Sequence, residues 1–202
     1  MERTAQDPAD PCRPGTVVCR PARPGDDEAV AALDGSFTTD AVIEVTVTEE
    51  GFGIRETPVR PPLHKVFPDE EGEDGEDGDA GGAGTAGGPE ARRTVVAVAG
   101  AELCGFVTVS FDPWNARLTV LDIGVAPAWR GKGVGRALMD HAVDHARERG
   151  AVHVWLEVSN VNVPAVRAYR RMGFTFCGLD TSLYDGTRSA GELALFMTRP
   201  VR

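Results

Sequence analysis

Apolar residues in the second half of the chain follow two different spacings, which predict strands and helices in turn. Two β-rich runs at 94–100 and 103–111 are separated by two residues, which predicts a hairpin. The run at 117–125 predicts a further strand. After it, apolar residues recur at helical intervals from Val134 and stop before Gly150, a residue type that commonly ends helices. The helical stripe comprises Leu138, Met139, Ala142, Val143 and Ala146.

The first half of the chain carries the same signals in shorter form. Residues 17–20 predict a short strand. Residues 25–37 predict a short helix with acids in its first turn and Gly35 at its end. An alternating run at 42–47 predicts a strand that turns at two nearby glycines into another extended segment.

The end of the chain predicts further strands around one helix. Residues 151–158 predict a strand, and Pro164 suits the first turn of a helix that Gly173 ends. Residues 174–179 and 192–199 predict the last two strands. The whole pattern predicts a mixed α/β fold with much antiparallel pairing.

Two polar segments interrupt this pattern. Residues 1–16 and 68–91 contain too little apolar surface to offset the entropy of ordering, so they predict a disordered tail and a flexible insertion. The remainder predicts one domain over 17–202. Residues 69–79 carry eight acids and no base, so the net charge of −10 falls to −2 without them. The predicted domain therefore has no basic footprint for nucleic acid.

The sequence shows no membrane, secretion or metal signature. Its apolar runs are far shorter than the ~20 residues of a membrane helix, and its polar start lacks the apolar region of a signal peptide. These features predict a cytoplasmic protein and leave its oligomeric state open between monomer and homodimer. The four cysteines match no zinc or redox spacing, and the pair His141 and His145 lacks the glutamate of a zincin.

Three glycines in residues 129–135, WRGKGVG, lie between a predicted strand and a predicted helix. Unpaired N–H groups at a helix N-terminus favour an anion such as phosphate. A P-loop would need serine or threonine after Lys132 and glycine at position 126, which is alanine. A dinucleotide fingerprint would need G-x-G-x-x-G, whereas these glycines are spaced G-x-G-x-G.

The pattern Arg130-x-x-Gly133-x-Gly135 resembles the coenzyme A pyrophosphate loop of the GNAT superfamily of N-acetyltransferases. A second block over 155–174, WLEVSNVNVPAVRAYRRMGF, resembles a later motif of the same superfamily, and it is especially similar to ribosomal-protein N-terminal acetyltransferases. The two blocks stand in the family order over 119–175. They imply the GNAT acyl-CoA N-acyltransferase fold, a central, mostly antiparallel sheet flanked by helices.

Segments outside these blocks narrow the resemblance. The stretches LDGSFTTDAVIEV, PPLHKVFPD, WNARLTVLDIGVAP and FCGLDTSLYDG, together with the acidic insertion, are similar to the streptothricin acetyltransferase family of actinobacteria. The similarity runs from about residue 17 to the C-terminus. It implies acetyl transfer from acetyl-CoA to an amino group on the β-lysine portion of streptothricin, as self-protection or resistance.

The resemblance also implies where acetyl-CoA binds. The donor is expected between the strand that ends at Val125 and the strand of Glu157. Asn162 matches an asparagine that contacts coenzyme A in the superfamily, and it suits a helix N-cap equally well. The expected coenzyme A contacts are Ile123, Val125, Arg130, Gly131, Lys132, Gly133, Val134, Gly135, Arg136 and Asn162.

Acetyl transfer to an amine needs a base and an acid. An alkyl ammonium with a pKa near 10.4 is only about one part in a thousand neutral at pH 7, so a carboxylate is suited to take its proton. Glu157, within the apolar run VWLEV, matches the base of the N-terminal acetyltransferases. Asp122 is the alternative, and either acid is equally suited to bind the ammonium. Tyr169 occupies the superfamily's general-acid position, and its phenol suits protonation of the leaving thiolate.

Two other functions stay open on the sequence alone. The WLEV strand favours a protein N-terminal or other small-amine acetyltransferase. A non-catalytic acetyl-CoA sensor is the second, although the presence of both Tyr169 and Glu157 argues against it. Four aromatic residues are candidates for a substrate pocket, although packing is the commoner role of any one of them: Phe37, Trp114, Trp129 and Tyr184.

Overall fold

The computed structural model describes residues 16–66 and 92–201. The tail predicted over 1–16, apart from its last residue, and the insertion predicted over 68–91 lie outside these ranges. None of the helices in the described part of the chain has the length and apolar content that a membrane span requires.

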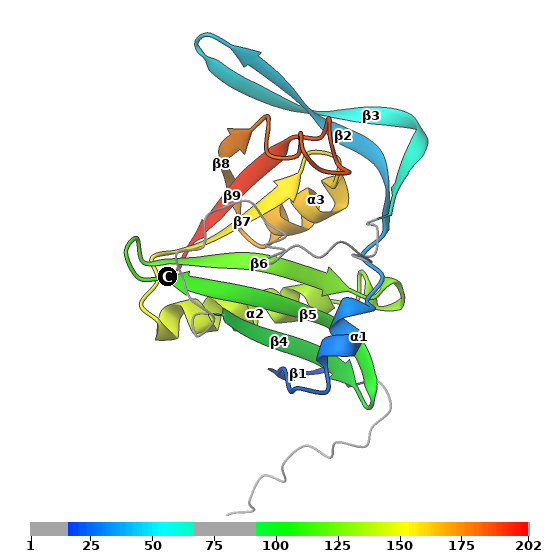
Figure 1. Ribbon diagram of the computed structural model, residues 1–202, viewed down its shortest axis with the longest axis vertical. Coiled ribbons are helices and arrows are strands. Elements are labelled where there is room, and N and C mark those ends of the chain that lie inside the picture. The colour runs from blue at the N-terminus through cyan, green and yellow to red at the C-terminus, as the bar shows by residue number, and fades with distance from the viewer. Residues whose placement is uncertain (1–15, 67–91, 202) are drawn as a thin grey trace, which may run out of the picture.

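Seven strands form one mixed sheet in the order β1-β4-β5-β6-β7-β9-β8 (Figure 1). Among the described strands, β6 and β7 pair in parallel and every other neighbouring pair is antiparallel. The bounds are β1 Val18–Pro21, β4 Arg92–Ala99, β5 Glu102–Asp112, β6 Arg117–Val125, β7 His153–Ser159, β8 Thr175–Asp180 and β9 Ala194–Pro200. The sheet agrees with the predicted strands to within a few residues, and the predicted mixed α/β class is confirmed.

The remaining strands, β2 (Phe37–Thr48) and β3 (Gly51–Lys65), form a separate long hairpin that projects from the sheet (Figure 1). Its base is held to the sheet by Asn160, which donates from Nδ2 to the Ile43 carbonyl (3.0 Å) and accepts the Ile43 N–H at its own carbonyl (2.8 Å). Ile43 is buried, whereas Val47 and Phe52 near the tip are exposed. The base of the hairpin therefore belongs to the core, and the tip does not.

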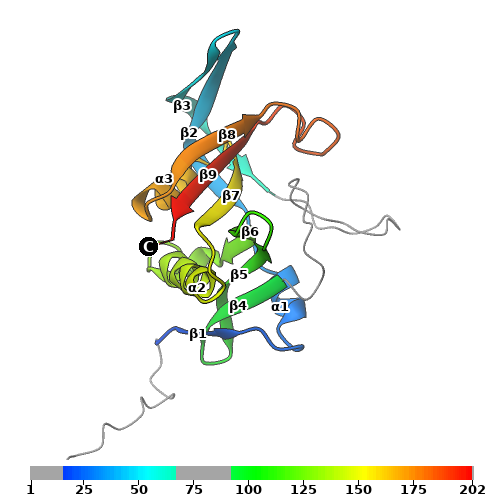
Figure 2. The same ribbon diagram turned by 90° about the vertical axis from the view of Figure 1, so that its left-hand side faces the viewer.

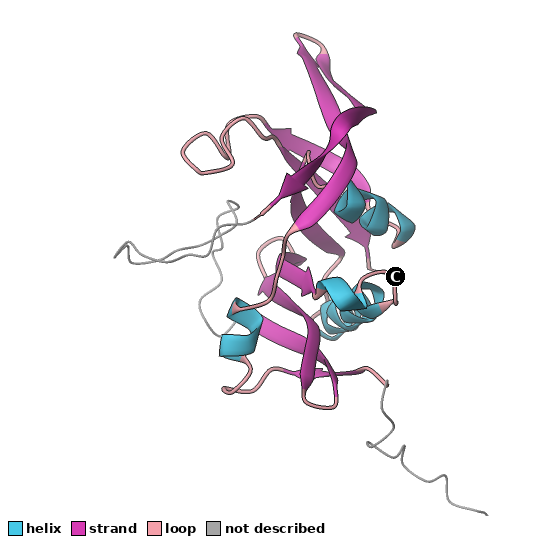
Figure 3. Ribbon diagram, turned by 90° about the vertical axis from the view of Figure 1, so that its right-hand side faces the viewer, coloured by secondary structure: helices cyan, strands magenta, loops and turns pink. Residues whose placement is uncertain are grey.

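Helices α2 (Val134–Glu148) and α3 (Val163–Arg171) lie on one side of the sheet, and the short α1 (Asp27–Ala31) lies on the other (Figures 2 and 3). The start of α2 and the place of Pro164 in the first turn of α3 agree with the sequence prediction. The prediction that α1 extends to Gly35 was wrong. The helix ends at Ala31 because the following segment is held in another conformation, with the carbonyls of Asp34 and Ser36 accepting hydrogen bonds from Arg130.

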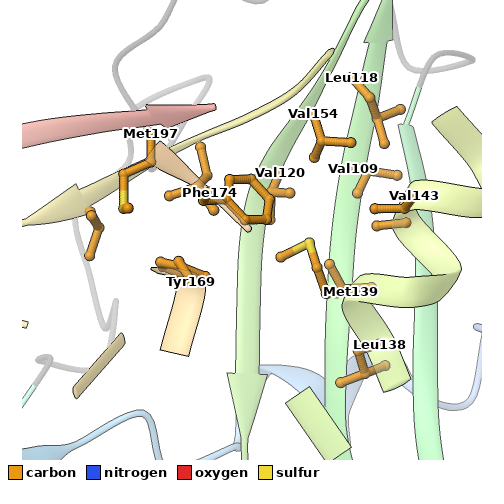
Figure 4. Packing of buried hydrophobic residues seen from close by; sticks show 14 of the residues in the cluster. Val109, Leu118, Val120, Leu138, Met139, Val143, Val154, Tyr169, Phe174 and Met197 are labelled. Carbon is orange, nitrogen blue, oxygen red and sulfur yellow. The ribbon is translucent and has the colours of Figure 1, made fainter. Parts of the chain in front are cut away.

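The core lies between the sheet and the two helices of its covered face. Figure 4 shows Leu138, Met139 and Val143 of α2 pointing toward β5 and β6, while Phe174 lies between Val120 of β6 and Tyr169 of α3. The predicted α2 stripe is buried in full, with each of its five members no more than 2% exposed. A continuous apolar layer thus fixes α2 against the strands that lead into the glycine-rich turn.

We expect Leu138→Ala to lower the free energy of unfolding by about 2–5 kcal/mol, because it removes a fully buried side chain and leaves a cavity. Urea denaturation measures the change. His141→Ala is the control on the same helix; its side chain is exposed, and we expect a change below about 0.5 kcal/mol. Equal effects of the two substitutions would contradict the packing described above.

Candidate active site

The two central strands separate within the sheet. The parallel pairing of β6 and β7 runs from Arg117 with His153 to Val120 with Leu156 and stops there. On the other side of β6, the register with β5 shifts between Val120 and Asp122, so Leu121 is an extra residue. A bulge of this kind bends a strand and increases its twist. The bend explains why β6 and β7 diverge toward their carboxyl ends in Figure 1.

Both acids that the sequence singles out stand just past the last β6–β7 pair. Glu157 follows Leu156 on β7, and Asp122 lies two residues after Val120 on β6. Their surroundings differ, because the side chain of Asp122 is exposed whereas Glu157 is partly buried. The expected separation of the two strands therefore exists beyond Val120 and Leu156, and we call it the gap. Of the two carboxylates beside it, Glu157 is the more buried.

Glu157 receives a hydrogen bond on Oε1 from the hydroxyl of Tyr184. Burial raises the pKa of Glu157, and the nearby carboxylate of Glu192 raises it further, while the Tyr184 hydrogen bond lowers it. The net result is a raised pKa, because loss of solvation dominates. A carboxylate with a raised pKa is a stronger base toward an ammonium than an exposed one.

Tyr169, on α3, faces the same gap. It is 8% exposed, and its ring lies 5.8 Å from that of Phe174, centroid to centroid. Burial raises the pKa of Tyr169, and the negative charges of Asp122 and Glu157 raise it further. The phenol is therefore protonated at neutral pH and able to donate a proton. The structure thus brings together the three side chains that the sequence proposes for catalysis.

The glycine-rich segment links the end of β6 to the start of α2 through a short 3-10 turn, η2 (Pro127–Trp129). Gly131 and Gly133 adopt left-handed conformations, with φ of 73° and 88°, and Gly133 is the N-cap of α2. Gly135 lies in the first helical turn, where an added Cβ would stand 3.4 Å from Cγ2 of Val125. The turn therefore brings backbone N–H groups to a helix start, as an anion site requires.

The basic residues of this turn differ in what they contact. Arg130 donates to the carbonyls of Val125, Ser36 and Asp34, at 2.9, 2.5 and 2.9 Å, and so ties the turn to the segment before β2. Lys132 lies over the ring of Trp129, 5.1 Å from its centroid. Arg136 is exposed, and its Nε lies 3.9 Å from Oδ2 of Asp140. A phosphate contact of Arg130 stays a prediction, and the bonds observed give this residue a structural role as well.

The other expected coenzyme A contacts lie on β6 and at the starts of α2 and α3. Ile123 and Val125 belong to the part of β6 that pairs with β5 but has no partner in β7. Val134 is buried beneath the turn. Asn162 is the N-cap of α3 and accepts the Ala165 N–H on Oδ1 at 3.3 Å, so its predicted capping role is confirmed. Its coenzyme A contact stays a prediction.

The four candidate aromatic residues differ in burial and in the residues that they contact. Phe37 is buried, Trp114 is 79% exposed, and Trp129 donates to Glu102 on the surface. Tyr184 reaches Glu157 from the loop between β8 and β9. Tyr184 is therefore the aromatic candidate that joins the site.

Sequence reasoning missed a cluster of three further polar residues, of which Glu192 acts on Glu157 through its charge. Lys65, at the end of β3, and Ser159, on β7, both donate to the carboxylate of Glu192, the latter at 2.5 Å. The side chains of Lys65 and Glu192 are only 17% and 14% exposed. These residues are far apart along the chain, so no local pattern joins them; the one weak signal is that Lys65 is one of two lysines in the sequence.

The separation of β6 from β7 therefore occurs near a partly buried carboxylate, a buried phenol and a glycine-rich turn suited to an anion, which is an arrangement compatible with acyl transfer from a coenzyme A thioester. The acetyltransferase (GNAT) family model matches residues 59–174, and the chain belongs to this family. It is an N-acetyltransferase, and enzymes of this family use acetyl-CoA as the donor. The predicted family and fold class are confirmed.

Individual relatives share more than the family motifs. The chain is 61% identical over 186 residues to streptothricin acetyltransferase of Streptomyces lavendulae, covering 92% of this chain and 95% of that protein. It is 56% identical to nourseothricin acetyltransferase in a crystal structure, with a TM-score of 0.80 over 92% of this chain and 99% of that one. Ribosomal protein bS18-alanine N-acetyltransferase of Escherichia coli is 34% identical over 83 residues, only 41% of this chain.

We expect Gly133→Ala to lower the free energy of unfolding by about 1–2 kcal/mol, because a side chain is unfavourable at a φ of 88°. An added Cβ would meet nothing within 4 Å, so the cost comes from the backbone alone. Gly135→Ala is the matched control within the helix, and we expect it to be neutral or stabilising by up to about 1 kcal/mol. Urea denaturation of both variants measures this, and a fully stable Gly133→Ala would contradict the described turn.

Proposed function

We propose that this protein transfers the acetyl group of acetyl-CoA to an amino group of streptothricin, on its β-lysine portion, and so gives resistance to that antibiotic. The observation that carries the proposal is the similarity to streptothricin acetyltransferase over nearly the whole of both chains. The partial likeness to a ribosomal-protein acetyltransferase covers less than half of the chain.

The charges of the gap support an amine substrate. Asp122, Glu157 and Glu192 place negative charge on the acceptor side, where Lys65 forms an ion pair with Glu192. A site with this balance attracts a cationic group, because opposite charges near a low-dielectric wall interact more strongly than in water. The ammonium form is the predominant form of an alkyl amine at neutral pH.

The proposed chemistry moves two protons and one acetyl group. Glu157 accepts a proton from the substrate ammonium, directly or through a water molecule, and the neutral nitrogen attacks the thioester carbonyl. The new C–N bond forms as the C–S bond breaks, and Tyr169 donates its phenolic proton to the departing thiolate. The products are the acetamide and free coenzyme A.

The donor side of the gap is proposed to hold coenzyme A. Gly131, Gly133, Val134 and Gly135 offer backbone N–H groups at the start of α2 to the pyrophosphate, and Lys132 and Arg136 add positive charge. Ile123 and Val125 line the unpaired side of β6, and Asn162 caps the helix that carries Tyr169.

We expect the purified protein to release free thiol from acetyl-CoA when streptothricin is added, with formation of the acetylated antibiotic by mass spectrometry. An N-terminal ribosomal-protein peptide is the comparison substrate and should release no thiol. Preference for the peptide would favour the N-terminal acetyltransferase function instead. Binding of acetyl-CoA without turnover of any amine tested would favour a sensor.

We expect Tyr169→Phe to lower kcat by about 100-fold or more, with little change in acetyl-CoA affinity, because it removes only the proton donor. Glu157→Gln should lower kcat/KM and abolish its acid limb, which for the unchanged enzyme should lie above the ordinary glutamate pKa of about 4.3. Asp122→Asn is the matched control and should keep that limb. If Asp122→Asn abolishes the limb and Glu157→Gln keeps it, Asp122 is the base.

A further inference from the structure

The loop between β8 and β9 brings a second tyrosine to the proposed base. The chain contains only two tyrosines, Tyr169 and Tyr184. Tyr184 is the one that forms a hydrogen bond with Glu157, and its hydroxyl is the donor. Figure 2 shows the loop leaving the ends of β8 and β9 on the side of the sheet away from α3, so the two tyrosines approach Glu157 from different elements.

Hydrogen bonds within the loop hold the backbone around Tyr184. At its start, Oδ1 of Asp180 accepts hydrogen bonds from the N–H groups of Ser182 (2.8 Å) and Leu183 (3.0 Å). Just beyond Tyr184, Thr187 donates its N–H and its hydroxyl to the Tyr184 carbonyl, at 2.9 and 2.8 Å. These bonds fix the backbone on both sides of Tyr184, which limits the positions open to its phenol.

The other end of the loop is tied to the same strand. Glu192 accepts the Ser159 hydroxyl on Oε2 and the Lys65 ammonium on Oε1, while Lys65 also donates to Ser189 at 3.0 Å. Ser159 stands two residues after Glu157 on β7. The loop therefore contacts β7 at two points, one through the Tyr184 hydroxyl and one through the Glu192 carboxylate.

We propose that Tyr184 is a positioning residue that holds the Glu157 carboxylate in its ionised form and fixes its orientation, and that Glu192 opposes this effect through its charge. The proposal rests on the function proposed above, in which Glu157 is the base. Because Tyr184 occupies Oε1 and no described residue donates to Oε2, the second oxygen is the one presented to the ammonium. Tyr184 thereby selects which oxygen receives the proton.

Tyr184 and Glu192 shift the pKa of Glu157 in opposite directions. The Tyr184 hydroxyl lowers the pKa of Glu157, and the charge of Glu192 raises it, on top of the increase caused by burial. The other groups around the site are Lys65 from β3, Asp122 from β6 and Tyr169 from α3. Burial and the Glu157 charge raise the pKa of Tyr184 itself, so its hydroxyl remains a donor at neutral pH.

The test is the pH dependence of kcat/KM for the amine in two variants. Tyr184→Phe removes the bond that favours the carboxylate, so its acid limb should move to higher pH by about one unit. Glu192→Gln removes the opposing negative charge, so its acid limb should move to lower pH. In both variants the KM for acetyl-CoA should be unchanged. Absence of a shift in Tyr184→Phe, or shifts of the same sign in both, would overturn the proposal.

A second measurement separates this proposal from the proposed function. In the free protein labelled with 13C at the glutamate carboxyl, NMR follows the titration of Glu157, whose signal is assigned by its loss in Glu157→Gln. Its titration should move in the same directions as the acid limbs, whether or not streptothricin is the substrate. An unchanged titration in Tyr184→Phe would overturn the positioning role even in a fully active enzyme.

The other tyrosine provides the matched control. Tyr169→Phe makes the same chemical change at a residue that forms no described hydrogen bond to Glu157, so the Glu157 titration should stay within about 0.3 units while kcat falls. A shift equal to that of Tyr184→Phe would show that loss of either phenol acts through general polarity, which would also overturn the specific role of Tyr184.

Discussion

The extra residue in β6, Leu121, is the local feature on which the site depends. Up to Val120 the strand pairs on both sides, but past the bulge it keeps β5 and loses β7. A strand deprived of one neighbour presents backbone N–H and C=O groups that need partners. The same divergence leaves β7 without a β6 partner from Glu157 onward, although Glu157 still pairs with Phe196 of β9. The β6–β7 pairing thus ends next to this irregularity, where Asp122 and Glu157 stand.

The ionisation of Glu157 and Tyr169 depends on their incomplete solvation. Glu157 and Tyr169 both have raised pKa values because burial penalises their charged forms, and the charges of Asp122 and Glu157 raise the pKa of Tyr169 further. The result is a carboxylate that binds a proton more readily and a phenol that keeps its own. The Tyr184 hydrogen bond acts against burial at Glu157, so the carboxylate keeps part of its stabilisation without exposure to water.

Two side chains that act on Glu157 come from outside the family-matched region. The family model covers residues 59–174, so Tyr184 and Glu192 follow it, whereas Lys65, at the end of the long β2–β3 hairpin, lies within it. That hairpin is held to the sheet through Asn160, next to the strand that carries Glu157. Glu157 and Tyr169 therefore lie in the part of the chain that the family model matches, whereas Tyr184 and Glu192 lie beyond it.

The sequence by itself determined the elements and the motif chemistry. Periodicity placed β6 and α2 correctly, and glycine spacing placed the turn between them, because these features depend on residues a few positions apart. Family resemblance added Tyr169, Glu157 and Asp122 as candidates, with Glu157 as the preferred base and Asp122 as the alternative. Only the tertiary structure showed how the surroundings of the two acids differ, since the burial of Glu157 and its bond to Tyr184 arise from segments distant along the chain. It also showed that Arg130 contacts the segment before β2 and that Lys65 pairs with Glu192, because these contacts join residues that are far apart along the chain. The early end of α1 has the same cause, since the segment that follows this helix is held by Arg130.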